Sequence, residues 1–170
     1  CATTSAQVAE CQDITVSLDS FNVYQLDPLQ VYTGDTGYAD ITVEPSIFSC
    51  DELGDNTVIL SVTDQDGITT TCSSVVTIEG FPNPLIAPAC WDQNEIYLLE
   101  NQTVQITADM VLAGGPYRCP SNYEVELFDE NWEVMNRDTV TLQDVGVTIF
   151  ADVEDPITGY SCWGELLILP

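Results

Sequence analysis

The chain has 170 residues, 45% of them apolar, and its 28 acidic residues against two basic ones, Arg118 and Arg137, give a net charge of −26. Such an anionic surface repels phosphate backbones and acidic lipid headgroups, which excludes a nucleic-acid partner. No apolar run approaches the roughly 20 residues that span a bilayer, so we expect no membrane insertion. The sequence has no His and no Lys, and without an imidazole base or a reactive amine we expect no enzyme.

The chain opens at Cys1 rather than at Met, and we interpret it as an excised segment of a processed or larger protein. Its first half is a series of short predicted strands. They cover residues 1–10, which alternate weakly, residues 14–18 with 21–26 as their hairpin partner, and residues 39–43, which Pro45 ends. The strongest signal is residues 57–78, where Val58, Leu60 and Val62 share one face of a strand, residues 64–67 (DQDG) supply a turn, and a second strand follows.

The same hairpin recurs in residues 147–169, where Ile149, Ala151 and Val153 share one face. Before it, strands are predicted at residues 96–99, 103–107, 123–128, 133–135 and 139–142, with one helical turn at 108–112 and with 96–99 pairing with 103–107. A hairpin repeated about 90 positions apart predicts two domains, residues 1–79 and 90–170. Residues 80–89 contain three prolines and are predicted to form a stiff linker.

Seven cysteines accompany this pattern, without a C-x-x-C pair and without His. This argues against a zinc site and favours disulfides formed in an oxidising, extracytoplasmic compartment. An odd count leaves at least one cysteine unpaired within the chain. Because no long window shows a helical period, the fold class is predicted to be all-β, built from antiparallel sandwiches.

Two sets of residues resemble known repeats. The first comprises Cys11 with ITVSLD at 14–19, FSC at 48–50, LGDNTV at 53–58, VTD at 62–64 with Gly67, and Cys72. The second comprises ITADMVL at 106–112, GGPY at 114–117, DVG at 144–146, DP at 155–156 and SCWG at 161–164. With these residues, nearly the whole of 11–169 resembles the HYR-like, immunoglobulin-type repeats of large secreted surface proteins of Bacteroidetes. The resemblance implies two tandem immunoglobulin-like antiparallel β-sandwich domains, stapled by disulfides, in an extracellular or cell-surface protein.

The same resemblance implies two particular disulfides, Cys11–Cys72 and Cys90–Cys162. Each would tie the first strand of a domain to its last strand. The alternation of the last strands agrees, since Cys72 and Cys162 fall on the side that faces the core.

The chain departs from the pattern of these repeats at two places, because the cysteines usual near residues 37–38 and near Gln102 are absent. Cys50 and Cys119 are therefore expected to be unpaired or bonded to another chain, and Cys1 is spare. A Cys1–Cys50 bond is an alternative.

Calcium is the one metal that the sequence suggests. Asp64 and Asp66 begin an oxygen-ligand loop, and the loops nearby add Asp35, Asp40, Asp51 and Asp55. The Glu that would complete an EF-hand loop is missing, because Val75 occupies its position. We favour the simpler interpretation that these residues form turns, and no other cofactor is expected.

Three tryptophans, Trp91, Trp132 and Trp163, are candidates for a sugar-stacking platform, although such residues more often pack in a core. Trp163 follows a predicted bridge cysteine on the opposite face of its strand and is expected to be partly exposed. Asn101 begins an N-glycosylation sequon, NQT, and Thr139 lies in the short D-T-V pattern of O-glycosylation.

The expected function is that of a structural or adhesive repeat, in a stalk, an adhesin or an extracellular fibre. Its partners would then be neighbouring repeats or identical subunits. One alternative is a calcium-dependent module that binds surface glycans. Another is a filament subunit, in which residues 1–10 add a strand to a neighbour's sheet.

Overall fold

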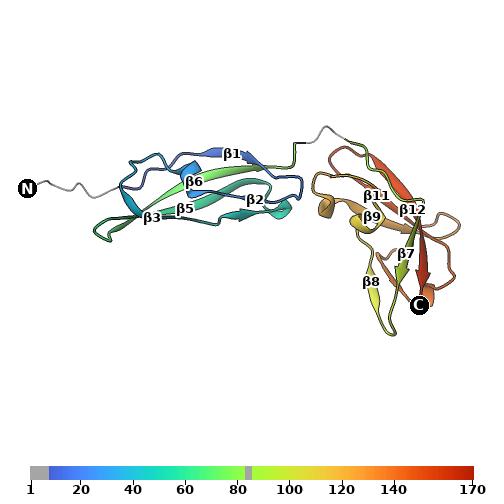
Figure 1. Cartoon of the computed structure of the whole chain (residues 1–170). Helices are drawn as coiled ribbons and strands as arrows, with labels where there is room; N and C mark the ends of the chain where they lie inside the picture. Colours follow the sequence, from blue (N-terminus) through green and yellow to red (C-terminus); the bar gives the residue numbers. More distant parts are fainter. Residues whose placement is uncertain (1–7, 83–85) are drawn as a thin grey trace, which may run out of the picture. The chain divides into compact units, whose positions relative to one another are not determined.

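The computed structural model describes residues 8–82 and 86–170. The chain divides into two compact units, Cys1–Pro82 (unit 1) and Asn83–Pro170 (unit 2), each with its own sheets (Figure 1). Within the described ranges no helix is long and apolar enough to cross a membrane. Residues 1–7 of the predicted N-terminal strand and 83–85 of the predicted linker lie outside the described residues, so the strand and the stiffness of the linker stay predictions.

Unit 1 consists of two sheets. The larger has the strand order β1 (Ile14–Ser17), β6 (Thr69–Glu79), β5 (Gly54–Asp64) and β3 (Tyr38–Glu44), and the smaller pairs β2 (Tyr24–Gln25) with β4 (Ile47–Phe48). A helical turn α1 (Pro28–Val31) and a 3-10 turn (Cys50–Glu52) lie in the connections. β5 pairs antiparallel with both β6 and β3, whereas β1 runs parallel to β6.

Unit 2 repeats this topology strand for strand. Its larger sheet has the order β7 (Gln93–Tyr97), β12 (Ser161–Leu169), β11 (Ile149–Glu154) and β9 (Glu124–Phe128), and its smaller sheet pairs β8 (Thr103–Gln105) with β10 (Thr139–Thr141). The helical turn α2 (Ala108–Val111) corresponds to α1, and 3-10 turns occur at Pro120–Asn122 and Leu142–Asp144. Here too the first strand, β7, is parallel to the last, β12. The repeated hairpin of the sequence therefore belongs to a repeated domain.

The alternation of the closing hairpins decides which residues form each core. Val58 and Leu60 of β5, like Ile149 and Val153 of β11, are fully buried, and Phe48 of the smaller sheet in unit 1 is buried with them. Burying a side chain of this size stabilises a fold by roughly 1.5–3 kcal/mol. In each unit two packed layers of mainly antiparallel strands enclose this core, and the chain is thus all-β, a tandem of two immunoglobulin-like sandwiches.

The predicted hairpin of residues 14–18 with 21–26 is wrong. β1 pairs with β6 in the larger sheet, while β2 pairs with β4 in the smaller one. The predicted pairing of residues 96–99 with 103–107 is wrong in the same way, because β7 pairs with β12 and β8 with β10. Alternation specifies which face of a strand is buried, but it does not specify the neighbouring strand, and in both units the chain crosses between the sheets at this point.

Two shorter elements also differ from the prediction. Residues 133–135 form no strand and contribute one isolated bridge, between Val134 and Phe128. The helical turn expected at 108–112 is present as α2, but α1 has no counterpart among the predicted elements. Its signals are local: Asp27 caps the helix, Pro28 occupies its first turn, and the Gln30 side chain accepts the Asp27 N–H.

Candidate functional site

Each unit is closed by a disulfide between its first segment and its last strand. Cys11, just before β1, is bonded to Cys72 in β6, with the two Cα atoms 6.0 Å apart. Cys90, just before β7, is bonded to Cys162 in β12 at a Cα distance of 5.5 Å. These are the two pairings that the resemblance implies. Beyond each bridge, the last strand continues extended, to Glu79 in unit 1 and to the end of β12 in unit 2.

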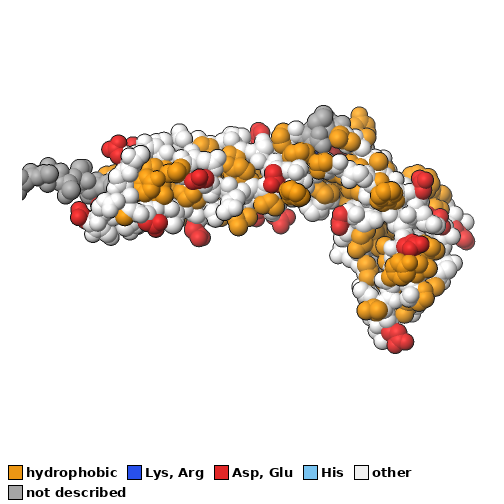
Figure 2. All heavy atoms as spheres, in the orientation of Figure 1, with side chains coloured by type: hydrophobic (Ala, Val, Ile, Leu, Met, Phe, Trp, Pro, Cys, Tyr) orange, Lys and Arg blue, Asp and Glu red, His pale blue; other side chains and the backbone are white. Residues whose placement is uncertain are grey.

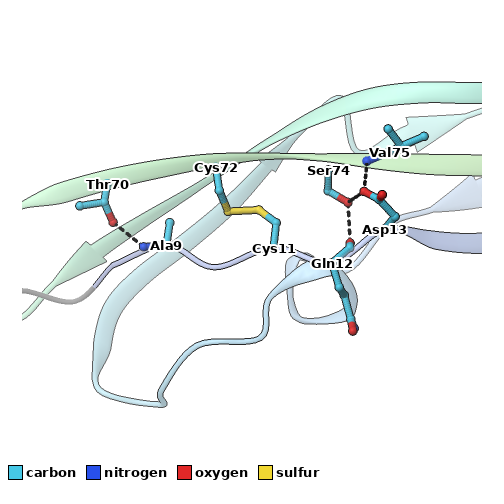
Figure 3. The surroundings of a disulfide bond; sticks show 8 residues. All are labelled: Ala9, Cys11, Gln12, Asp13, Thr70, Cys72, Ser74 and Val75. Atoms are coloured by element: carbon cyan, nitrogen blue, oxygen red, sulfur yellow. Dashed lines mark hydrogen bonds between the residues drawn. A yellow bond between two sulfur atoms is a disulfide. The ribbon is translucent and has the colours of Figure 1, made fainter.

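Hydrogen bonds fasten the first segment of unit 1 to β6 on both sides of the Cys11–Cys72 bridge (Figure 3). They join the Ala9 N–H to Thr70 Oγ1 at 2.9 Å, the Ser74 hydroxyl to the Gln12 carbonyl at 2.5 Å, and the Val75 N–H to an Asp13 carboxylate oxygen at 2.7 Å. The segment is thus held along β6 by covalent and polar links before the β1–β6 pairing begins.

In unit 2 the first segment passes so close to β12 that a side chain would not fit between them. A Cβ built on Gly164 would lie 2.2 Å from the carbonyl oxygen of Trp91 and 3.0 Å from Nδ2 of Asn94. Trp91 is itself fixed, because its N–H donates to the Val111 carbonyl at 3.0 Å. The Gly of the SCWG stretch is therefore required by the approach of two backbones.

Two of the remaining cysteines contradict the prediction. Cys50 and Cys119 are both buried and both disulfide-bonded, so the expectation that they are unpaired is wrong. Cys50 begins a 3-10 turn, and Cys119 has a left-handed backbone with φ 47° before another such turn. The expectation followed from the two missing cysteines of the repeat pattern, and the absence of the usual partner does not exclude a different one. Cys1 lies outside the described residues.

The acidic residues nominated for calcium do not form a group of ligands. Asp64 is 7% exposed, and its Oδ1 accepts the N–H groups of Asp66 and Ile68, both at 2.9 Å, so it shapes the turn between β5 and β6. Across residues 8–82 and 86–170, no three or more acidic or cysteine side chains are arranged as metal ligands. Neither Asp35 nor Asp40 therefore joins Asp64 and Asp66 in such a group.

The turn that begins at Asp64 also occurs at residues 19–23 and 129–133. In each case an Asp side chain accepts two backbone N–H groups, and the Asp N–H donates to the carbonyl four residues later. The fourth residue of each turn has a left-handed backbone, with φ 59° at Asn22, 80° at Gly67 and 61° at Trp132. Asn and Gly tolerate this conformation, but a bulky residue there is strained by about 1–2 kcal/mol.

The strained turn places Trp132 on the outer face of the larger sheet of unit 2. Its ring lies flat on Phe150 of β11, with centroids 4.8 Å apart and planes 2° apart. Trp163 of β12 stands edge-on to both rings, at 5.3 and 5.6 Å, and Phe128 of β9 lies 5.8 Å from Trp132. Trp132 is 48% and Trp163 53% exposed. We call these four residues the aromatic cluster; Trp91, the third candidate, is exposed but belongs to no ring pair with them.

Four carboxylates, here called the acidic patch, continue the same outer face: Glu124, Glu126, Asp152 and Glu154. Asp152 lies opposite Glu126 on one side and opposite Trp163 on the other, and Glu154 lies opposite Glu124. The four side chains, with Val125, line a depression of about 240 Å³. Burial raises the pKa of Asp152, against the opposing effect of a hydrogen bond with Ser161. Figure 2 shows hydrophobic and acidic side chains interspersed on the visible face of each unit.

Sequence reasoning missed most of this surface, although the signal is present. In residues 124–128 and 149–154, the positions between the core residues hold Glu126 and Phe128 on one strand and Phe150 and Asp152 on the next. On β5 and β6 the corresponding outer face of unit 1 carries mainly hydroxyls, together with Asp55, Ile59 and Val75. The hydroxyls belong to Thr57, Ser61 and Thr63 of β5 and to Thr69, Thr71, Ser73 and Thr77 of β6.

The glycosylation candidates differ in accessibility. Asn101 is exposed in the turn between β7 and β8, with a left-handed backbone at φ 61°. Thr139, the first residue of β10, is only partly exposed. Modification at either residue stays a prediction.

Arg137, one of the two basic residues, forms an ion pair within unit 2. Arg137 donates to both carboxylate oxygens of Asp144, at 2.9 and 2.5 Å, and to the Thr139 carbonyl at 2.9 Å. Asp144 is 6% exposed and also accepts the Thr141 N–H at 2.8 Å. The pKa of Asp144 lies below its ordinary value, chiefly because its carboxylate accepts the hydrogen bonds from Arg137. The same hydrogen bonds raise the pKa of Arg137. Arg118 is exposed in a loop.

No protein-family model matches the chain, and no curated protein matches its sequence. Among solved structures, it is similar to the titin immunoglobulin tandem A164–A165 at 10% identity, covering 95% of each chain with a TM-score of 0.40. It is also similar to the endo-fucoidan hydrolase MfFcnA9 (14% identity, 99% of this chain and 35% of that one, TM-score 0.33) and to domains of Clostridium perfringens ZmpB (16%, 86% and 28%, TM-score 0.32). The chain thus spans about a third of the length of these last two proteins.

With TM-scores of 0.40 or less and identities of 16% or less, these similarities carry no argument about the fold. The fold assignment rests on the sheets and disulfides of the chain itself. By that criterion the chain is a tandem of two immunoglobulin-like β-sandwiches, each closed by a disulfide between its first segment and its last strand.

Proposed function

We propose that the chain is a structural and adhesive module of a secreted or cell-surface protein, and that it transmits tension along the polypeptide without lengthening. The observation that carries the proposal is the placement of the two bridges, each of which joins the segment that enters a sandwich to the strand that leaves it.

The path of a pulling force follows from this placement. In unit 1, tension that arrives at Cys11 crosses the disulfide to Cys72 and continues along β6, which already runs extended to Glu79. In unit 2 it crosses from Cys90 to Cys162 and continues along β12. The bridges span sequence separations of 61 and 72 residues, and those loops contain most of each core. Tension therefore bypasses the hydrogen bonds and side-chain packing that hold the sheets together.

Composition and redox chemistry support the same proposal. Disulfides persist in oxidising compartments, which supports a location outside the cytoplasm. A net charge of −26, divided between two small domains, makes the molecules repel one another and favours solubility. Identical copies repel one another for the same reason, so an adhesive contact made by this chain calls for a partner with the opposite charge.

Single-molecule force spectroscopy on the full chain, held at its two ends, tests the load path. In the oxidised chain we expect no lengthening from either bridged loop. After reduction, unfolding should release about 200–220 Å from the loop of unit 1 and about 240–260 Å from that of unit 2, at 3.3–3.6 Å per residue over separations of 61 and 72.

A control in the same oxidised chain moves one handle from the N-terminal end to Thr36, an exposed residue between α1 and β3 and well inside the loop that the Cys11–Cys72 bridge closes. Pulling from there loads the sheets directly, because the chain between Thr36 and either bridge cysteine is folded into them. Unit 1 should therefore rupture and lengthen, which shows that the assay detects such events. If the oxidised chain held at its ends lengthens by the full increments, the proposed load path is wrong.

The filament alternative depends on residues 1–10, most of which lie outside the described residues. It predicts concentration-dependent polymers that disappear when residues 1–10 are deleted, and light scattering of the deletion variant separates it from the load-bearing module. The calcium-dependent glycan module predicts binding on a glycan array that chelation abolishes.

A further inference from the structure

The aromatic cluster has no part in the load path and yet presents two half-exposed tryptophans. Exposed aromatic patches on soluble domains mark interaction sites more often than they serve stability. Trp132 is held there by a turn whose other copies use Asn22 and Gly67 at the same position. A bulky residue in a left-handed backbone is strained, and strain of this kind is concentrated at functional sites. The cluster is therefore a candidate contact surface in its own right.

The acidic patch gives this surface its electrostatic character. Glu126 lies directly opposite Asp152, and Glu124 directly opposite Glu154, on neighbouring antiparallel strands. Like charges placed in this way destabilise a sheet. The ion pair found within the described residues, between Arg137 and Asp144, lies at the 3-10 turn after β10 and not among the patch residues. The patch is thus a concentration of negative charge beside open aromatic rings.

A basic side chain complements both halves of this face. A guanidinium stacks on a tryptophan ring, and it also forms bidentate hydrogen bonds with a carboxylate. The distances suit both contacts, because Asp152 and Trp163 are directly opposed on adjacent strands, which lie about 4.8 Å apart in a sheet. A neutral sugar could stack on the rings but would leave the repulsion among the carboxylates in place.

A second copy of the chain is a poor occupant, since each copy carries a charge of −26 and only two basic residues. We therefore propose that the outer face of β9, β11 and β12 binds an extended basic segment of another protein, with an Arg stacked on Trp132 or Trp163 and paired with Asp152 and Glu126. This inference rests on the proposed adhesive role and names the chemistry of the partner.

Calorimetry on the full oxidised chain tests the proposal with a short capped peptide in which Arg alternates with Thr. Tryptophan fluorescence is followed in parallel, because all three tryptophans lie in unit 2. A peptide with Glu in place of Arg and a panel of neutral oligosaccharides are titrated alongside. Increasing salt should weaken binding of the Arg peptide, since salt screens charge.

Matched variants distinguish binding of the Arg peptide at this face from its non-specific electrostatic attraction to an acidic protein. Glu126→Gln with Asp152→Asn removes two charges from the acidic patch, and Asp40→Asn with Glu44→Gln removes two from the exposed outer side of β3 in unit 1. The patch pair should weaken binding about tenfold or more, which corresponds to the loss of one charged contact, whereas the unit 1 pair should change it less than about twofold. Trp132→Asn should also weaken binding, and because Asn suits the backbone of this turn, that variant keeps the fold.

Three results would overturn the proposal: equal weakening by the two charge pairs, binding of the Arg peptide without a tryptophan signal, or no binding at all. Binding of a neutral oligosaccharide that Trp132→Asn abolishes, without binding of the Arg peptide, would make the face a glycan site instead. None of these results alters the force response of the bridges, so failure of this inference and failure of the proposed load path remain distinguishable.

Discussion

Replacing Asp144 by Asn should destabilise unit 2 and leave unit 1 unchanged. The Asp144 carboxylate is 6% exposed and accepts two hydrogen bonds from Arg137 together with the Thr141 N–H. Asn has nearly the same shape, so the variant opens no cavity. It does remove the charge, and it leaves the Arg137 guanidinium partly buried without its counter-ion.

The expected loss is about 2–4 kcal/mol. Breaking a fully buried ion pair from one side costs about 3–5 kcal/mol, but the Arg137 side chain is 34% exposed, so solvent reduces the penalty. For a domain of this size, that loss lowers Tm by about 8–32 °C. The pKa of Asp144 is held below its ordinary value in the folded state, chiefly by Arg137. Its contribution is therefore complete above the unfolded pKa and is lost as the pH falls through the folded pKa.

Thermal unfolding followed by tryptophan fluorescence isolates unit 2, because unit 1 contains no Trp. The difference between parent and variant should be largest near neutral pH and should shrink below about pH 4. Asp109→Asn, at an exposed acid of α2, makes the same change of charge and serves as the control. If Asp144→Asn and Asp109→Asn have the same Tm at pH 7, the Arg137–Asp144 pair does not stabilise unit 2 in the way proposed.

The remaining predictions concern the bridges and the turns. Replacing both Cys11 and Cys72 by Ser should destabilise unit 1 by about 2–4 kcal/mol, measured by hydrogen exchange of β5, since the bridge closes a long loop; unchanged protection would contradict it. Gly164→Ala should destabilise unit 2 by about 1–3 kcal/mol in urea, because its Cβ meets a backbone oxygen, and an unchanged midpoint of unfolding would show that the two backbones leave room for a methyl group. Asp64→Ala should destabilise unit 1 by about 1–2 kcal/mol, because two N–H groups of the β5–β6 turn lose their acceptor, and an unaltered midpoint of unfolding would refute that role.

The elements that the sequence predicts well are those whose two faces differ strongly. In the closing hairpins, Val58, Leu60 and Val62 of β5 and Ile149 and Val153 of β11 alternate with neighbours that are mostly polar, Ile59 and Phe150 being the exceptions, and both hairpins form as expected. The pattern does not specify which strand each strand pairs with. The alternation of apolar and polar residues in β1 and β2 is compatible both with a hairpin and with strands in separate sheets. A local sequence pattern does not predict that the chain passes from one sheet to the other between these strands, because this depends on how the two sheets pack in the complete sandwich.

The candidate contact surface was partly predictable. Trp163 is exposed, as expected from its position after a core-facing Cys162. The approach of Trp132 to Phe150 was not predictable, because it depends on a left-handed turn at a residue that does not favour one. The turn at Asp64 was predicted, although its composition also suits a calcium loop, and its hydrogen bonds show how the Asp64 side chain shapes it.

The central claim is that each sandwich is bridged from its first segment to its last strand. A peptide map under non-reducing conditions tests it directly, with cleavage at Asp and Glu, since 28 acidic residues and only two basic ones make trypsin unsuitable. We predict linked peptides that join Cys11 to Cys72 and Cys90 to Cys162. Free thiols at these four positions, or a bond from Cys11 to Cys90 or from Cys72 to Cys162, would contradict the account.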